Sequence, residues 1–483
     1  MHPASACFVF SAPALALALG LSATAFAETA GRGAAGRIQS SVPGDGPLPP
    51  SLSLALLQDA GSRGTPSPAG PPVGPWETNR PIAAVRRELY RSHPRPRAAA
   101  LTAVHYVGPG LERREWRAVS SRDDVSDEQV ARWSPDNGRT WSAWVPQQPS
   151  SMVKYGAVEV WEGGWGDTHD PESGRLVQMW LRQIQRRKLY HCFTYVRTST
   201  DLGRTWSVPV PLRYEPGPEF DPQDPASSAF LDRNEGYPGS NIARLDDGTL
   251  VLALAHANAP GDPRKAERSW RLGSVLFRGR WNPGRGAYDW TPGARVEIPA
   301  GKSARGLMEP EVGVLRDGRL LVVWRGSDVS WEGVRAGEPG RKWYSLSADG
   351  GRTLGPVRPW TYSDGSPFYS PSSRHRLHRH SVNGRLYWFG NLCASPPDGN
   401  HPRYPLVIAE VDEATGCLRR GTVTVVADRA PHEGRQVQYS NFSLLEDRET
   451  HAFELHLSTY GQEAAPADWS TADSWKLTVT LAR

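Results

Sequence analysis

The feature that most constrains the fold is an eight-residue motif that occurs three times in the chain. Its pattern is Ser-x-Asp-x-Gly-x-Thr-Trp, and the copies are Ser134–Trp141, Ser199–Trp206 and Ser347–Leu354, of which the last ends in Leu. In each copy the Asp can accept backbone N–H bonds across a tight turn, the Gly supplies a positive φ, and the Trp buries a large ring beside the turn. The motif therefore predicts the same strand–turn–strand unit at three places.

A longer repeat runs between the copies of this motif. Apolar strands flank short turns that recur about every 65 to 75 residues, and two of the six turns are weaker copies. The turns centre on Gly110, Gly174, Gly248, Gly318, Gly384 and Arg448. Six units of about 65 residues, each with three or four short strands, are typical of blades that repeat around a central axis. The pattern predicts an all-β fold, a six-bladed β-propeller over residues 95–483 with few helices.

Composition agrees with this fold and excludes several classes of function. The 483 residues include 19 Trp, 48 Gly and 43 Pro, which suits short strands and tight turns. Net charge is only +5, and no Lys/Arg block of the kind that binds nucleic acid is present. Beyond the first thirty residues, no apolar run approaches the roughly 18 residues of a membrane span. We expect no nucleic-acid partner, no membrane span and a monomer.

The N-terminal region is predicted to lie outside the propeller. Residues 1–27 are predicted to be a signal peptide, because the stretch from Ala4 is apolar and Ala25-Phe26-Ala27 matches the small-x-small cleavage pattern. Residues 28–75 are of low complexity and are interpreted as a linker or propeptide. We therefore expect a secreted or periplasmic protein whose propeller domain occupies residues 76–483.

The cysteines and histidines give no evidence for a metal or cofactor. Without the leader, Cys192, Cys393 and Cys417 remain, so at most one disulfide can form, and Cys393–Cys417 is the candidate pair. No two cysteines have metal-ligand spacing. The stretch His375–His380 (HRLHRH) interleaves Arg with His, so we interpret it as a cationic loop at the funnel mouth. No metal and no cofactor is predicted.

Chemistry in such a fold is expected in the funnel at the propeller axis, where the inner strands begin. Polar residues shortly before each hairpin turn are candidates for its lining, and others follow just beyond the inner strands. The first group is Asp167, His169, Asn241, Glu309, Glu311, Tyr439 and Asn441, and the second is Arg182, His256, Arg325 and Asn391. Their convergence predicts a carbohydrate-binding type of site, with Asn241, Glu311 and Asn441 among its substrate-binding residues.

The Ser-x-Asp-x-Gly-x-Thr-Trp motif resembles the Asp box of the sialidase (neuraminidase) superfamily, and the resemblance extends over residues 95–483 in blade count. It implies that Asp136, Asp201 and Asp349 are structural turn residues on the outer blade edges. It also implies three arginines that hold the substrate carboxylate, a Tyr–Glu pair and an Asp acid/base. Arginine forks match carboxylate geometry, and a neutral phenol can attack an anomeric carbon that bears a carboxylate.

Four residues resemble the family pattern in order and spacing. Glu309 in MEPEVGVL resembles the Glu that polarises the tyrosine, and Arg325, 16 residues later, takes the place of the second arginine. Arg403 in HPRYPLVIAEVD resembles the third arginine. Tyr439 in QYSNFSLL, 36 residues later, resembles the nucleophile. The resemblance implies an exo-α-sialidase-like glycoside hydrolase that releases a terminal acidic sugar from an oligosaccharide or glycoconjugate.

The remaining two roles depend on position alone. The first arginine of the family precedes an Ile-Pro pair, which neither Arg95 nor Arg97 does; we assign Arg97, 37 residues before the first Asp box. The acid/base Asp is expected in the loop before that box, which offers Asp123, Asp124 and Asp127, and we assign Asp124.

Two other functions are compatible with the sequence. A propeller polysaccharide lyase acting on uronate-containing glycans needs a neutral base and a cationic clamp, which His169, His191 or Tyr237 and Arg182 would supply. A non-catalytic propeller that binds glycans or proteins is the third possibility, because a fold does not determine a function.

Overall fold

The computed structural model describes residues 81–121, 126–147, 152–155, 158–186, 189–257, 259, 273–330 and 333–482. The predicted signal peptide (1–27), the predicted linker (28–75) and Asp124 lie outside the described residues.

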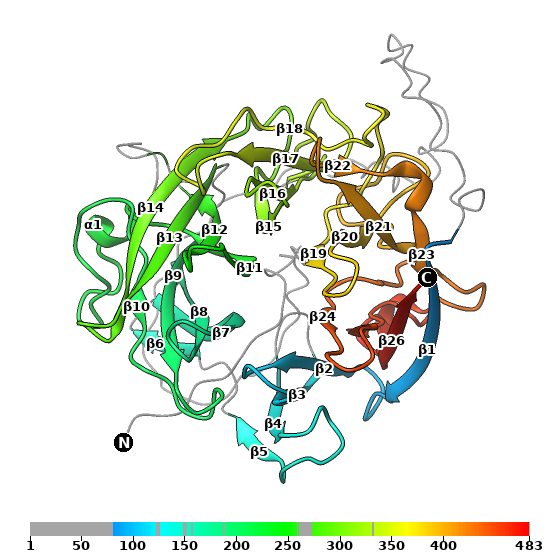
Figure 1. The fold of residues 1–483 in the computed structure, drawn as a ribbon, viewed down its shortest axis with the longest axis horizontal. Coiled ribbons are helices and arrows are strands. Elements are labelled where there is room, and N and C mark those ends of the chain that lie inside the picture. Colours follow the sequence, from blue (N-terminus) through cyan, green and yellow to red (C-terminus); the bar gives the residue numbers. More distant parts are fainter. Residues whose placement is uncertain are drawn as a thin grey trace, which may run out of the picture. The chain divides into compact units, whose positions relative to one another are not determined.

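Six antiparallel sheets are arranged as blades around a common axis (Figure 1). Blade 1 contains β2 (Ala99–Tyr106), β3 (Arg113–Ser120), β4 (Glu128–Ser134) and β5 (Val145–Gln147). Blade 2 has four main strands, which are β7 (Val158–Asp170), β8 (Arg175–Arg186), β9 (Leu189–Ser199) and β10 (Val210–Pro211). A short additional strand, β6 (Met152–Tyr155), pairs with β7. Blade 3 contains β11 (Tyr237–Arg244), β12 (Leu250–Ala257), β13 (Gly273–Asn282) and β14 (Ala287–Glu297).

The other three blades follow the same plan. Blade 4 contains β15 (Met308–Val314), β16 (Leu320–Arg325), β17 (Lys342–Ser347) and β18 (Arg358–Pro359). Blade 5 contains β19 (Arg376–Arg379), β20 (Leu386–Asn391), β21 (Leu406–Asp412), β22 (Cys417–Leu418) and β23 (Thr424–Ala427). Blade 6 contains β24 (Ser443–Glu446), β25 (Phe453–Ser458), β26 (Ser474–Leu481) and β1 (Ala83–Arg91). The predicted all-β, six-bladed propeller is confirmed, and the α-helix of the described residues, α1 (Ser228–Leu231), is a single turn.

Blade 6 is assembled from two distant parts of the chain. β1 pairs antiparallel with β26, in a register that runs from Ala83 opposite Leu481 to Arg91 opposite Ser474. The repeat pattern gave no signal for this strand, which lies before the six repeat units. Because β1 supplies the outer strand of the last blade, the ring is closed by backbone hydrogen bonds and the edge of β26 is covered.

The predicted turns occupy the predicted places. The hairpins that join the first and second strands of blades 2 to 5 turn at four glycines with positive φ, which an L side chain rarely adopts. They are Gly174 (66°), Gly248 (81°), Gly318 (82°) and Gly384 (65°). In blade 6 the corresponding turn has His451 at φ 59°.

The three copies of the eight-residue motif form identical turns after the third strands of blades 1, 2 and 4. In the first, the Asp136 carboxylate accepts bonds from the Thr140 amide (2.7 Å), the Thr140 hydroxyl (2.6 Å) and the Ser134 hydroxyl (2.9 Å). The same contacts recur around Asp201 and Asp349. The bonds from Thr140 lower the pKa of Asp136 to about 2.

The hydrophobic core lies between neighbouring blades. Its largest fully buried rings include Trp324, Trp343, Trp360 and Trp388, all from blades 4 and 5. Trp360 and Trp388 meet edge to face, with centroids 5.5 Å apart. Truncating such a ring to Ala typically costs about 3–5 kcal/mol, so the blade interfaces give a rigid frame to the side chains at the axis.

The predicted Cys393–Cys417 disulfide is wrong, because Cys393 and Cys417 are both free, buried thiols. The two thiols have different surroundings: the Cys393 Sγ lies 3.7 Å from the Pro402 carbonyl, and the Cys417 Sγ lies 3.6 Å from the Tyr344 hydroxyl. Among the described residues, no helix has the length and apolarity that crossing a membrane requires.

Candidate functional site

A buried carboxylate–guanidinium pair lies where blade 4 begins at the axis. Met308 of β15 pairs with Arg325 of β16, and Glu309 departs from the regular register with φ 40°. The Arg325 Nη1 donates to the Glu309 Oε2 at 2.7 Å, and the Arg325 Nε donates to the Ser372 hydroxyl at 2.7 Å. Both side chains are almost fully buried. The structure thus brings together two of the residues that the family resemblance selected.

Two more arginines surround this pair. Arg403 donates to the Gln438 side chain (2.6 Å) and to the Ser372 carbonyl (3.2 Å), so Arg325 and Arg403 share Ser372 as a partner. Arg374 lies two residues before β19, is 5% exposed, and acts electrostatically on Glu309. The Arg374 Nη1 has no hydrogen-bond partner among the described residues.

Positive charge therefore exceeds negative charge around Glu309. Lys342 is also buried there, and burial lowers the pKa of its amine well below the usual range, which favours the uncharged form. Even without Lys342, three guanidiniums surround one carboxylate. Burying guanidiniums without enough counter-charge is costly, so this arrangement suits the binding of an anionic group.

Two neighbouring carboxyl groups have pKa values that are shifted in opposite directions. Burial favours the protonated form of Glu309, but the guanidiniums of Arg325, Arg374 and Arg403 outweigh it and hold the pKa of Glu309 below its usual range. Burial raises the pKa of Glu311, although Arg376 and the Leu377 amide oppose it. Each carboxyl group has one oxygen without a hydrogen-bond partner among the described residues. Two carboxyl groups whose pKa values are shifted in opposite directions are typical of a general base and a general acid.

Tyr439 has a different partner from the one expected. Its hydroxyl donates to the carboxylate of Glu433, with the two oxygens at 2.7 and 2.8 Å, and accepts a bond from the Arg87 Nη1 at 2.9 Å. The expected pairing of Tyr439 with Glu309 is wrong, because Glu309 is engaged by Arg325. Tyr439 is fully buried, and burial together with the bond to Glu433 raises its pKa further above the usual value.

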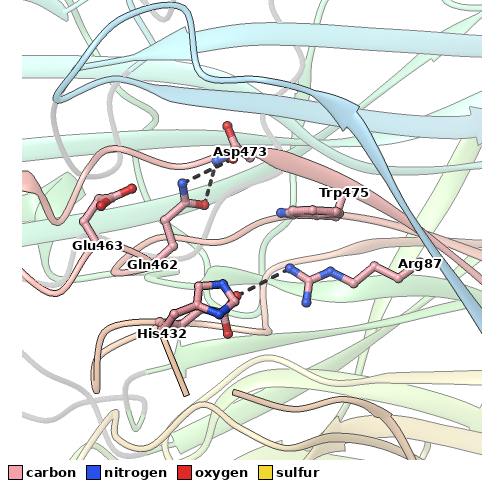
Figure 2. A pocket seen from close by; sticks show the side chains of 7 residues that line it. Arg87, His432, Gln462, Glu463, Asp473 and Trp475 are labelled. Carbon is pink, nitrogen blue, oxygen red and sulfur yellow. Dashed lines mark hydrogen bonds and ion pairs between the residues drawn. The ribbon is translucent and has the colours of Figure 1, made fainter. Parts of the chain in front are cut away.

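The Tyr439–Glu433–Arg87 group borders a cavity of about 460 Å³ in blade 6. Figure 2 shows the Arg87 side chain reaching into this cavity from β1 beside the Trp475 ring, where its guanidinium lies 3.9 Å from the ring centroid. The cavity is lined by Arg87, His432, Glu433, Gln462, Glu463, Asp473 and Trp475. Its carboxylates outnumber its one guanidinium, so this wall does not attract an anion.

Two of the remaining predicted site residues have partners outside the arginine cluster. The guanidinium of Arg97 is exposed and pairs with Asp468 at 3.2 Å. The Asn241 side chain bonds the backbone of Val312 in both directions (2.8 and 2.9 Å), which ties β11 to β15. Asn441 lies just before β24 with φ 56°, and Asp124 is outside the described residues.

The residues proposed for a lyase are also dispersed. His191 is buried and its Nδ1 contacts the Glu235 carboxylate. Arg182 pairs with Glu162 and bonds the Tyr195 hydroxyl, and His169 lines a cavity near the other ends of the inner strands. Tyr237 is buried edge to face against Trp165. The described residues thus show no base–clamp pair among them.

Sequence reasoning missed Arg374 and Glu433. The segment His375–His380 was expected to be a loop, but Arg376–Arg379 forms β19, the inner strand of blade 5. In a strand, alternate side chains point to one face. Leu377 packs in the core between blades 4 and 5, whereas Arg374 and Arg376 act on the carboxyl groups of β15. The alternation of cationic and apolar positions was the available signal.

No family model matches the chain, and no curated protein matches it. Solved structures do. A Dyadobacter fermentans protein of unknown function matches 82% of this chain and 99% of its own, with a TM-score of 0.51 at 14% identity. The K499G mutant of the NanB sialidase from Streptococcus pneumoniae matches 83% of this chain and 71% of its own, with a TM-score of 0.50 at 11% identity. A Penicillium chrysogenum α-L-arabinanase, at 16% identity and a TM-score of 0.45, covers 83% and 99%.

At these identities the similarity shows the fold alone. The six sheets of this chain adopt the same propeller architecture as the sialidase structure, which agrees with the fold implied by the eight-residue motif. This chain is a six-bladed, sialidase-like β-propeller.

Proposed function

We propose that this protein is an exported glycoside hydrolase that acts on glycans containing an acidic sugar. One observation carries the proposal: Arg325, Arg374 and Arg403 surround Glu309 in a buried site with excess positive charge. Guanidinium forks match a carboxylate in geometry as well as in charge. A sugar carboxylate would supply the counter-charge that the described residues lack.

The two carboxyl groups of β15 supply the chemistry. Glu311, held protonated, donates its proton to the glycosidic oxygen as the bond to the leaving group breaks. Glu309, in its ionised form, accepts a proton from the water molecule whose oxygen attacks the anomeric carbon and replaces the leaving group. An anionic carboxylate approaches an anomeric carbon best when the sugar's own carboxylate lies elsewhere on the ring. This site therefore favours a uronic acid.

A second candidate is a sialidase-type reaction, in which a neutral tyrosine attacks. It is favoured by the contacts of Tyr439, since Glu433 can accept the phenolic proton and Arg87 can stabilise the phenolate. In sialic acid the carboxylate is on the anomeric carbon, where a neutral nucleophile avoids repulsion. The acidic wall of the adjoining cavity opposes this candidate.

The experiment is hydrolysis of fluorogenic glycosides of glucuronic acid, sialic acid and glucose by the full chain. We expect turnover of the glucuronide, and we expect Arg374→Met to lower its kcat/KM by about 100-fold, because one buried charge contact is lost. Arg285→Met is the matched control, since Arg285 is an exposed hairpin residue that pairs with Asp289.

Other outcomes reject the proposal. Turnover of the sialoside alone, abolished by Tyr439→Phe, establishes the second candidate. Ultraviolet absorbance from a uronate polysaccharide, with no hydrolysis of any glycoside, indicates a lyase. Activity on the glucoside that equals activity on the glucuronide, in wild type and Arg374→Met alike, excludes a carboxylate clamp.

A further inference from the structure

A second cavity, of about 750 Å³, lies where the inner strands end, beside the hairpins that lead to the second strands. Four inner strands contribute to its wall: β2, β7 and β24 by their last residues, and β19 by residues from its first, Arg376, to its last, Arg379. The side chains that matter here are His105, Tyr106, Asp167, Arg376, Glu446 and Arg448. The Glu309–Arg325 pair lies at the start of β15 and the end of β16, and neither residue lines this cavity.

The carboxylates of this cavity already have partners. Asp167 accepts bonds from Arg114 at 2.6 Å and from Gln178 at 3.1 Å. Glu446 accepts a bond from the Ser381 amide at 2.9 Å and lies 3.4 Å from the His378 Nε2. The Arg114 guanidinium thus balances the charge of Asp167, whereas Glu446 is held by hydrogen bonds.

Arg448 is in the opposite situation. Its guanidinium lies 4.0 Å from the centroid of the Tyr106 ring, and its Nη1 donates to the carbonyl of Gly108 at 2.9 Å. No carboxylate pairs with Arg448 within the part of the chain that the structure describes. Neutral carbonyls and a ring hold the side chain in place, and the Glu112 carboxylate acts on it electrostatically without forming an ion pair.

Arg376 brings a second cation to the same cavity. It lines the wall, and its Nε lies 3.1 Å from the Glu311 Oε1. One carboxyl oxygen occupies only part of the five-donor fork of a guanidinium. Burial lowers the pKa of His105 to about 4, so its imidazole is neutral near pH 7 and adds hydrogen-bonding capacity without charge.

We propose that this cavity is a second ligand site, which binds the oxyanion group of an acidic sugar through Arg448 and Arg376. The volume falls in the range of small-molecule sites. The wall has three guanidiniums, of which that of Arg379 pairs with Glu413, and two carboxylates, together with neutral donors and acceptors. The inference does not depend on hydrolysis at Glu309. It gives the propeller a second acid-binding site, which adjoins the first at the contact of Arg376 with Glu311.

The test is titration calorimetry of the full chain with glucuronate, sulfate and glucose. We expect glucuronate to bind and Arg448→Gln to weaken its binding at this cavity by at least 10-fold. Arg285→Gln, on a distant exposed hairpin, should bind as the wild type does. All measurements are repeated in an Arg374→Met background, which removes the clamp near Glu309 and leaves this cavity intact.

Each result is decisive for the proposal. Arg448→Lys keeps the positive charge but lacks the planar guanidinium, so it should bind glucuronate with an intermediate affinity. It also tests whether the cavity keeps its structure when residue 448 is replaced. Equal binding by wild type and Arg448→Gln, or complete loss of binding in Arg374→Met, overturns the proposal. Binding of sulfate without glucuronate shows that the cavity recognises a free inorganic anion instead of a sugar.

Discussion

Replacing Glu311 with Gln is expected to lower kcat for the acidic glycoside by about 100- to 10,000-fold, the usual contribution of a general acid. Glu311 is buried, and burial raises its pKa, which favours the protonated form that a general acid needs. Gln has the same shape and keeps the contacts to Arg376 and the Leu377 amide as an acceptor. A loss of activity with unchanged thermal stability therefore measures the contribution of proton donation by Glu311 to catalysis.

The pH profile separates this role from a structural one. Activity needs Glu309 ionised and Glu311 protonated. The pKa of Glu309 lies below 4.5 and that of Glu311 lies above it. Wild-type kcat should therefore rise as pH increases through the lower value and fall as pH increases through the higher one. In Glu311→Gln the alkaline fall should disappear.

The leaving group provides the control for that variant. A nitrophenolate departs without a proton, so the defect of Glu311→Gln should shrink when the substrate carries it. An unchanged alkaline limb, or the same defect with every leaving group, would falsify the assignment of Glu311 as the acid.

Deleting β1 is expected to have the largest effect on stability. A variant that begins at residue 92 lacks the strand that pairs with β26 from Ser474 to Leu481, whereas one that begins at residue 77 keeps it. The loss of this ladder, at about 0.5–1.5 kcal/mol for each hydrogen bond, should lower the unfolding free energy by at least about 4 kcal/mol. It also removes Arg87 from Tyr439.

Thermal unfolding and size-exclusion chromatography measure both consequences. The shorter variant should unfold at a lower temperature and elute as aggregates, because β26 becomes an exposed edge strand. Arg87→Met in the longer variant separates the side chain from the strand, and should cause only a small part of the loss. Equal stability and a monomeric elution for the variant that begins at residue 92 would show that β1 does not close the ring.

The fold could be predicted from the sequence because the residues that specify each hairpin are close together in the chain and recur in every repeat unit. Each hairpin needs a positive φ at one position, and glycine supplies it at Gly174, Gly248, Gly318 and Gly384. The strand β1 escaped prediction for the same reason, since it lies outside the repeat and is specified by a partner at the other end of the propeller.

The site was predicted only in part. Glu309, Arg325 and Arg403 were found because their spacing along the chain resembles that of a known family, and the structure groups them. The partner of Tyr439 could not be found in this way. Glu433 lies six residues before Tyr439, in a segment without regular secondary structure. The direction of a side chain in such a segment does not follow from its spacing along the chain.

The union of β1 with β26 also determines the order in which the molecule can be made. Ala83 must meet Leu481, 398 residues later (481 − 83 = 398). Closing this loop costs only about 1.6 kcal/mol more than closing one of about 65 residues. The pairing of β1 with β26 is therefore delayed mainly by the time that synthesis of the chain takes. A ribosome releases the N-terminal strand long before its partner. Until then five blades can form, while β1 remains an unpaired strand that chaperones must shield.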